Sequence, residues 1–178
     1  MLTIDATVPV SISESGSAPE ASTTLQVLRA LNLLTLGHRS ELAEAQNPDA
    51  GHDIARLEAK IDMLIAMVGA LVTDHSGLPA PRPVRFNAES LEVNLDRAFA
   101  IGARVVVALY PNPDLPRPLI LPGTVDGACQ RDDGSHDITL TYSVDNPQLR
   151  DEFERYVFLC HRQSLGRQAA RSSQSSKI

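Results

Sequence analysis

Cysteine and histidine side chains, which could serve nucleophilic catalysis or metal binding, occur side by side at Cys160 and His161. On a helix, neighbouring side chains diverge by about 100°, so these two do not form a nucleophile–base pair by themselves. Cys160 is also in line with apolar residues, which predicts a small buried side chain. Cys129 has no histidine at metal-ligand spacing, and Asp132-Asp133 fits a turn better than an acid–base pair. The sequence therefore predicts no catalytic residue, no cofactor-binding residue and no metal ligand, and it does not indicate an enzyme.

Arginines recur through the last helical stretch, and they are the remaining candidates for binding chemistry. They are Arg150, Arg155, Arg162, Arg167 and Arg171. Their spacing does not place them on a single stripe of a helix. A solvated helix face is the main interpretation, and a surface for an anion or an acidic partner is the alternative.

Composition limits the classes of function. The chain has 178 residues, a formal charge of −6 and two cysteines, which fits one domain with an appendage or two small units. The acidic balance argues against broad binding of nucleic-acid phosphates. The start of the sequence lacks the basic and apolar pattern of a signal peptide, so a reducing cytoplasm is the expected location.

The longest periodic stretch, residues 53–75, predicts a coiled-coil helix roughly 34 Å long. Its heptad positions a and d are Ile54, Leu57, Ile61, Leu64, Val68 and Leu71. Residues 63–72 are all apolar or Gly, and this face is wider than the contact of a two-stranded coil. A homotetramer is therefore expected, with a dimer as the alternative and a buried core helix as the competing interpretation. The uncharged run holds eleven residues, against about 20 needed to cross a bilayer, so no membrane insertion is expected.

Strand-like alternation surrounds this helical middle. Residues 4–12 alternate between apolar and polar or small side chains, and a first helix is expected from about Ser22. After the prolines at 79–83, several short alternating segments separated by turn residues predict an antiparallel barrel or sandwich. Asn146-Pro147 then opens a final helix with an apolar stripe formed by Leu149, Phe153, Tyr156, Val157 and Cys160.

The order of these segments resembles the PilZ domain family. The segments are TVPVSI, VRFNAESLEV, AIGARVVVALY, LILPGTV and ITLTYS, and the resemblance covers residues 3–13 and about 84–165. It implies a small antiparallel barrel with a closing helix, and cyclic di-GMP as the usual ligand. An atypical branch of the family carries extra helices and forms tetramers through heptads, which implies that the two helices are an insertion after the first strand.

The ligand signature of that family is altered in this sequence. The family carries R-x-x-x-R before its first strand, but residues 1–5 contain no arginine, and Arg82 and Arg85 are three positions apart near another strand. Aligned on the second motif, [DN]-x-S-x-x-G, Arg85 stands at the acid, Asn87 at the Ser and Ser90 at the Gly. Bidentate guanidinium contacts are what such a site uses for phosphates, so little direct messenger binding is expected.

The predicted fold is α+β: a PilZ-like antiparallel barrel with a C-terminal helix and two long inserted helices, the second forming a coiled coil. The expected units are the first strand at 1–13, the helical pair at 22–76, the remaining barrel and closing helix at 82–171, and a flexible tail at 172–178. The expected function is a non-enzymatic oligomeric adaptor of cyclic di-GMP signalling that acts through an unidentified signalling or motility protein. A direct receptor with unconventional residues and a coiled-coil scaffold without a signalling role are the alternatives.

Overall fold

The computed structural model describes residues 2–14, 16, 19–37, 77–112, 115 and 117–175, with side chains up to residue 165. The predicted coiled-coil stretch at 53–75 falls outside these residues, and so do all six of its heptad positions. The structure therefore does not test the second inserted helix.

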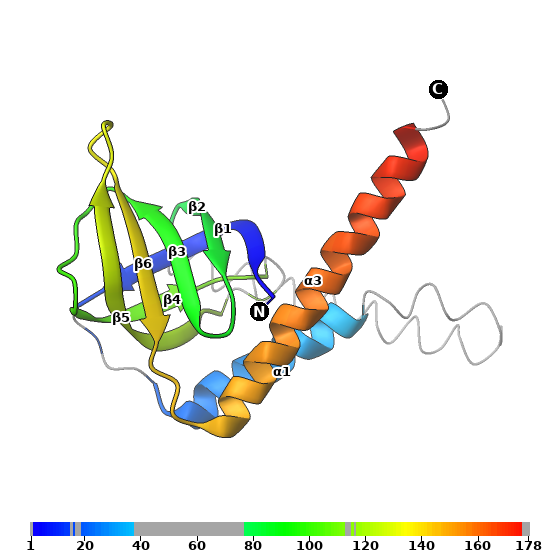
Figure 1. The fold of residues 1–178 in the computed structure, drawn as a ribbon. Coiled ribbons are helices and arrows are strands. Elements are labelled where there is room, and N and C mark those ends of the chain that lie inside the picture. The colour runs from blue at the N-terminus through cyan, green and yellow to red at the C-terminus, as the bar shows by residue number, and fades with distance from the viewer. Residues whose placement is uncertain are drawn as a thin grey trace.

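Six strands form a closed antiparallel barrel (Figure 1). They are β1 (Ile4–Ser13), β2 (Pro81–Phe86), β3 (Ser90–Leu95), β4 (Arg104–Leu109), β5 (Leu119–Gln130) and β6 (His136–Tyr142). Their order around the barrel is β1-β2-β3-β6-β5-β4. The first half of β1 pairs with β2 and its second half, from Val10, pairs with β4. This division of one long strand between two neighbours closes the sheet, and closure removes its exposed edges.

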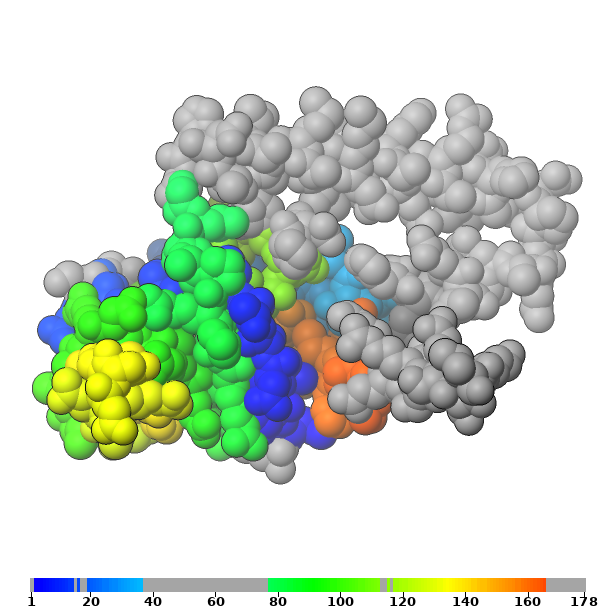
Figure 2. Space-filling model, turned by 90° about the horizontal axis from the view of Figure 1, so that it is seen from above, coloured from blue at the N-terminus to red at the C-terminus, as the bar shows by residue number. Residues whose placement is uncertain are grey.

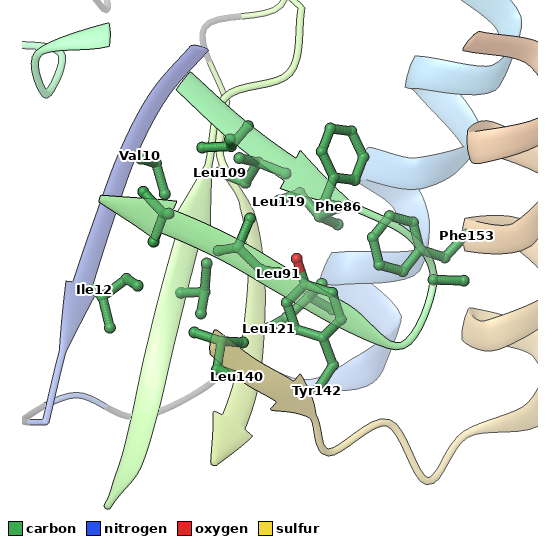
Figure 3. Packing of buried hydrophobic residues seen from close by; sticks show 14 of the residues in the cluster. Val10, Ile12, Phe86, Leu91, Leu109, Leu119, Leu121, Leu140, Tyr142 and Phe153 are labelled. Carbon is green, nitrogen blue, oxygen red and sulfur yellow. The ribbon is translucent and has the colours of Figure 1, made fainter. Parts of the chain in front are cut away.

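Side chains of alternating residues fill the barrel, as the period-two pattern of the sequence predicts. The most deeply buried residues come from strands β2 to β6 and from both helices: Leu28, Leu31, Phe86, Leu91, Val107, Leu109, Leu119, Leu121, Val125, Ile138, Leu140 and Phe153. Figure 3 shows Phe86, Tyr142 and Phe153 meeting where the last helix covers the barrel. The barrel and the last helix therefore share one core.

Two helices complete the described part of the chain, α1 (Ala21–Gly37) and α3 (Pro147–Ser175). Asn146 caps α3, because its side-chain oxygen accepts hydrogen bonds from the backbone N–H groups of Gln148 at 2.9 Å and Leu149 at 3.3 Å. The predicted stripe of α3 is confirmed: Leu149, Phe153, Tyr156 and Val157 are buried, and Cys160 is partly buried against the core.

The helices are also joined to one another by polar contacts. The side-chain amide of Asn32 on α1 donates to the backbone oxygen of Glu152 at 3.1 Å, and the amide of Gln163 donates to the backbone oxygen of Thr35 at 2.9 Å. Both bonds join the two helices in the same order along the chain, so α1 and α3 run in the same general direction. Figure 2 shows α3 between β1 and the end of α1.

Two boundaries differ from those predicted. The strand β2 begins at Pro81 and contains Pro83, whereas the sequence predicts a strand only from Val84. Proline has no N–H to donate, and the pairing of β2 with β3 ends at Val84↔Val93, while its pairing with β1 continues to Pro81. The backbone of α3 is helical through Ser175, past the expected boundary at 171.

Candidate functional site

The three altered motif positions are adjacent in the structure, and two of them hold a turn. Asn87 and Ser90 bracket the connection between β2 and β3. The side-chain oxygen of Asn87 accepts from the backbone N–H of Glu89 at 2.7 Å and of Ser90 at 2.8 Å, and its amide donates to the Ser90 hydroxyl at 2.9 Å. An Asn that bonds the backbone two and three residues ahead stabilises such a turn. The polar groups of Asn87 and Ser90 are therefore used within the hairpin.

Arg85 has a different position, on the outer face of β2. The register places it opposite Asp5 of β1 and opposite Glu92 of β3, and Glu92 lies in turn opposite Thr139 of β6. The Arg85 Nε is 3.9 Å from a carboxylate oxygen of Asp5, and 59% of the Arg85 side chain is exposed. A contact of that length between exposed side chains holds the guanidinium only weakly.

A shallow groove of about 800 Å³ follows this outer face across β1, β2, β3 and β6. We call it the barrel groove. Its polar and charged lining consists of Asp5, Thr7, Arg82, Arg85, Glu92, Asn94, Arg131, Asp137 and Thr139. Outward-facing residues of neighbouring strands come together here because the register aligns them in rows across the sheet. The barrel groove is the candidate site that contains a motif position.

Carboxylates engage the other two arginines of the barrel groove more tightly. Arg82 forms a salt bridge with Asp96, and the Arg131 Nε is 2.6 Å from an oxygen of Asp137. The other oxygen of Asp137 accepts from the Asn94 amide at 2.8 Å. Three guanidinium groups therefore face a similar number of carboxylates, and the groove has no excess of positive charge.

These contacts lower the pKa values of the carboxyl groups. The hydrogen bond and the charge of Arg82 lower the pKa of Asp96. Hydrogen bonds from Arg131 and then Asn94 lower the pKa of Asp137, and hydrogen bonds from Ser135 lower the pKa of Asp133. All three carboxyl groups are ionised at neutral pH, so each remains an acceptor for its partner.

The residues considered for catalysis stay apart. Cys129 is exposed on β5, while Cys160 lies on α3 beside Tyr156, whose pKa burial raises. Among the residues that the structure describes, no group of three or more His, Cys, Asp and Glu side chains is arranged to hold a metal ion. Within the same residues, no helix is long and apolar enough to cross a membrane.

Sequence reasoning missed the paired groups Arg82, Asp96, Arg131 and Asp137. Each residue stands at or near an outward position of an alternating strand. Such a position predicts that the side chain is exposed, but not which other side chain it forms a salt bridge with. The pairs join β2 to the end of β3 and the end of β5 to β6. Predicting them requires the register of the hairpins, which alternation alone leaves open.

Comparison with protein families gives a match to the atypical PilZ domain, described as a cyclic di-GMP receptor, over residues 16–171. Among solved structures, a tetrameric PilZ domain protein from Xanthomonas campestris, self-assembled through a helical bundle, is similar with a TM-score of 0.77 and 24% identity. That match covers 93% of this chain and 91% of the other. The Bacillus subtilis inhibitor of motility is less similar, with a TM-score of 0.38 and 18% identity over 48% of this chain and 42% of the other. No curated protein matches significantly.

Proposed function

The chain belongs to the atypical PilZ domain family, and from that premise we propose that it is a non-enzymatic, oligomeric adaptor of cyclic di-GMP signalling. In this proposal it acts through a protein partner and binds little of the messenger by itself. Membership places the chain in a cyclic di-GMP signalling family; the adaptor role is the proposal.

The proposal rests on the altered motif and on the carboxylates that already pair with the nearby arginines. Cyclic di-GMP presents two phosphates and two guanines, and guanidinium groups are the side chains best suited to hold them. In the barrel groove, Arg82 and Arg131 already bond to Asp96 and Asp137. A phosphate that bound there would have to displace a carboxylate and leave that carboxylate beside a second negative charge. Direct binding of the messenger is therefore disfavoured.

Self-association is the second part of the proposal. The structural neighbour from Xanthomonas campestris is described as a tetramer that assembles through a helical bundle. The heptad positions from Ile54 to Leu71 give this chain an apolar face suited to three or more helices. We propose a homotetramer, with a dimer as the alternative. Light scattering of the full chain is the test: a mass four times that of one chain is expected, and a monomeric mass would refute it.

Freeing the arginines tests the explanation for weak binding. In the double variant Asp96→Asn, Asp137→Asn, both salt bridges lose their carboxylate while side-chain size is kept. Calorimetric titration with cyclic di-GMP should give no saturable heat with the wild type and measurable binding with the double variant. The matched control is Asp126→Asn, which removes a carboxylate that bonds to Thr141 outside the barrel groove. Equal titrations for wild type and double variant would show that ion pairing does not set the affinity.

A direct receptor is the second candidate function. The family description names a cyclic di-GMP receptor, and Arg85 offers an exposed guanidinium with only a long contact to Asp5. On this candidate, the wild type itself binds the messenger, and Arg85→Ala removes that binding. On the adaptor proposal, Arg85→Ala changes nothing in the titration.

A further inference from the structure

A second groove lies between the β2–β3 turn and α3. It has a volume of about 540 Å³, and its apolar lining is Leu2, Ala88, Val157 and Phe158. We call it the helix groove. In Figure 1 the N-terminal end of the described chain and the β2–β3 turn both lie beside the first half of α3. Three segments far apart in the sequence therefore form its walls.

Two of the apolar side chains are exposed although the barrel core is adjacent. Phe158 is 46% exposed and Leu2 is 38% exposed, whereas Val157 and Ala88 are buried. The Phe158 ring carries the Arg162 guanidinium at 5.6 Å from its centroid, on the side of the next helical turn. Large apolar side chains that gather in a concave surface are a feature of interaction sites.

The rim of the helix groove is acidic. Glu89, Asp151 and Glu154 line it, together with the single cation Arg155. None of these three carboxylates makes a salt bridge with another described residue, in contrast to Asp96 and Asp137 near the barrel groove. Arg155 offsets one of the three carboxylates and Arg162 lies beside Phe158, so among the described residues the rim keeps a small net negative charge, which favours cations over phosphates and anionic lipid surfaces.

The walls of the helix groove are preformed. Asn87 holds the β2–β3 turn, and the Glu89 carbonyl accepts from the Tyr142 backbone N–H at 2.7 Å. On the other wall, Phe153 packs against Phe86 and Tyr142 and so fixes α3 to the barrel. A surface that is already ordered loses little conformational freedom on binding, which favours recognition of a short segment.

We propose that the helix groove docks a basic segment of a protein partner, one that inserts an apolar anchor beside Phe158 and places Lys or Arg side chains against Glu89, Asp151 and Glu154. This inference rests on the proposed adaptor function, because it assigns the surface through which the adaptor meets its partner. Charge complementarity selects the occupant: the apolar floor requires a Leu- or Phe-type anchor, and the acidic rim requires cations on both sides of it.

The probe for the test is a fluorescein-labelled synthetic peptide in which a Leu-Phe pair is flanked on both sides by Lys and Arg. Fluorescence anisotropy with the full chain at physiological salt should show saturable binding. Phe158→Ala and Glu154→Lys should each weaken binding by about tenfold or more, because each removes a group from the centre of the contact. A peptide with Glu in place of Lys and Arg should not bind.

Two variants serve as matched controls. Ile101→Ala shortens an exposed apolar side chain before β4, and Asp132→Lys reverses an exposed charge at the β5–β6 turn, both outside the helix groove. Both should bind the peptide as the wild type does. Absence of saturable binding to the wild type, or equal loss in the controls, would overturn the proposal.

The remaining outcomes separate this inference from its premise. If Phe158→Ala lowers the mass of the assembly in light scattering, a second copy of this chain occupies the groove, and the partner proposal is wrong. If the peptide does not bind, while the assembly is intact and the messenger gives no heat, the proposed docking site is wrong and the adaptor function is not contradicted. If the wild type binds cyclic di-GMP tightly, the adaptor function falls independently of the peptide result.

Discussion

Replacement of Phe153 by alanine tests whether α3 is part of the barrel core. Phe153 is completely buried, and its ring centroid lies 6.5 Å from that of Phe86 and 5.6 Å from that of Tyr142. Removal of a fully buried phenylalanine typically costs about 3–5 kcal/mol, and the loss of two ring contacts favours the upper part of this range. We therefore expect Phe153→Ala to lower the free energy of unfolding by about 4 kcal/mol.

Urea denaturation followed by circular dichroism measures this difference. Because self-association adds a concentration-dependent contribution to stability, wild type and variant are compared at the same series of protein concentrations. Phe158→Ala is the matched control, since it removes the same side chain from the same helix at a position that is 46% exposed. It should cost less than about 1 kcal/mol. Equal and small losses for both variants would refute the shared core of α3 and the barrel.

Three other perturbations follow from the sequence and the contacts. Leu64→Asp should split the assembly into smaller species in light scattering, because a charge buried in the helix contact costs several kcal/mol by order of magnitude; an unchanged mass would refute the heptad interpretation. Asn87→Ala should lower the free energy of unfolding by about 1–2 kcal/mol, since its side chain makes three hydrogen bonds in the β2–β3 turn; a loss within error would contradict that role. Asp96, Asp133 and Asp137 have folded-state pKa values below those of the unfolded chain, so their contribution to stability is present above about pH 4 and is lost as pH falls through the folded-state values. Urea denaturation at a series of acidic pH values should show this loss, and the free energy of unfolding of Asp137→Asn should fall less steeply with decreasing pH than that of the wild type. An equally steep fall in the variant would contradict the role of Asp137.

The local sequence pattern predicts much of this fold, because the strand period of two and the helical period of about 3.6 residues are both easy to recognise. Alternation in residues 4–12 predicts β1, and the stripe that contains Phe153 predicts the buried face of α3; the structure confirms both. The end of α3 is not predicted: a tail is expected from 172 because the residues there are polar and mostly Ser, whereas the backbone is helical through Ser175 and no proline interrupts it.

Long-range pairing is the part that local pattern leaves open. Alternation does not show that β1 divides its length between β2 and β4. It also does not show that Asn32 of α1 reaches the backbone of Glu152 on α3, a contact between residues more than a hundred positions apart. Both candidate grooves depend on such placement, since each gathers residues from three or more segments. The sequence identifies the motif positions Arg85, Asn87 and Ser90. It does not predict that Asn87 and Ser90 bond to each other in a turn, or that Arg85 lies near Asp5 on the surface.

Calorimetric titration of the wild-type chain with cyclic di-GMP at physiological salt tests the central claim most directly. The adaptor account predicts heat at the level of ligand dilution, or dissociation weaker than about 100 μM, because the guanidinium groups near the motif positions already face carboxylates. Saturable binding of one messenger per chain in the low micromolar range or tighter would contradict it and would establish the direct receptor.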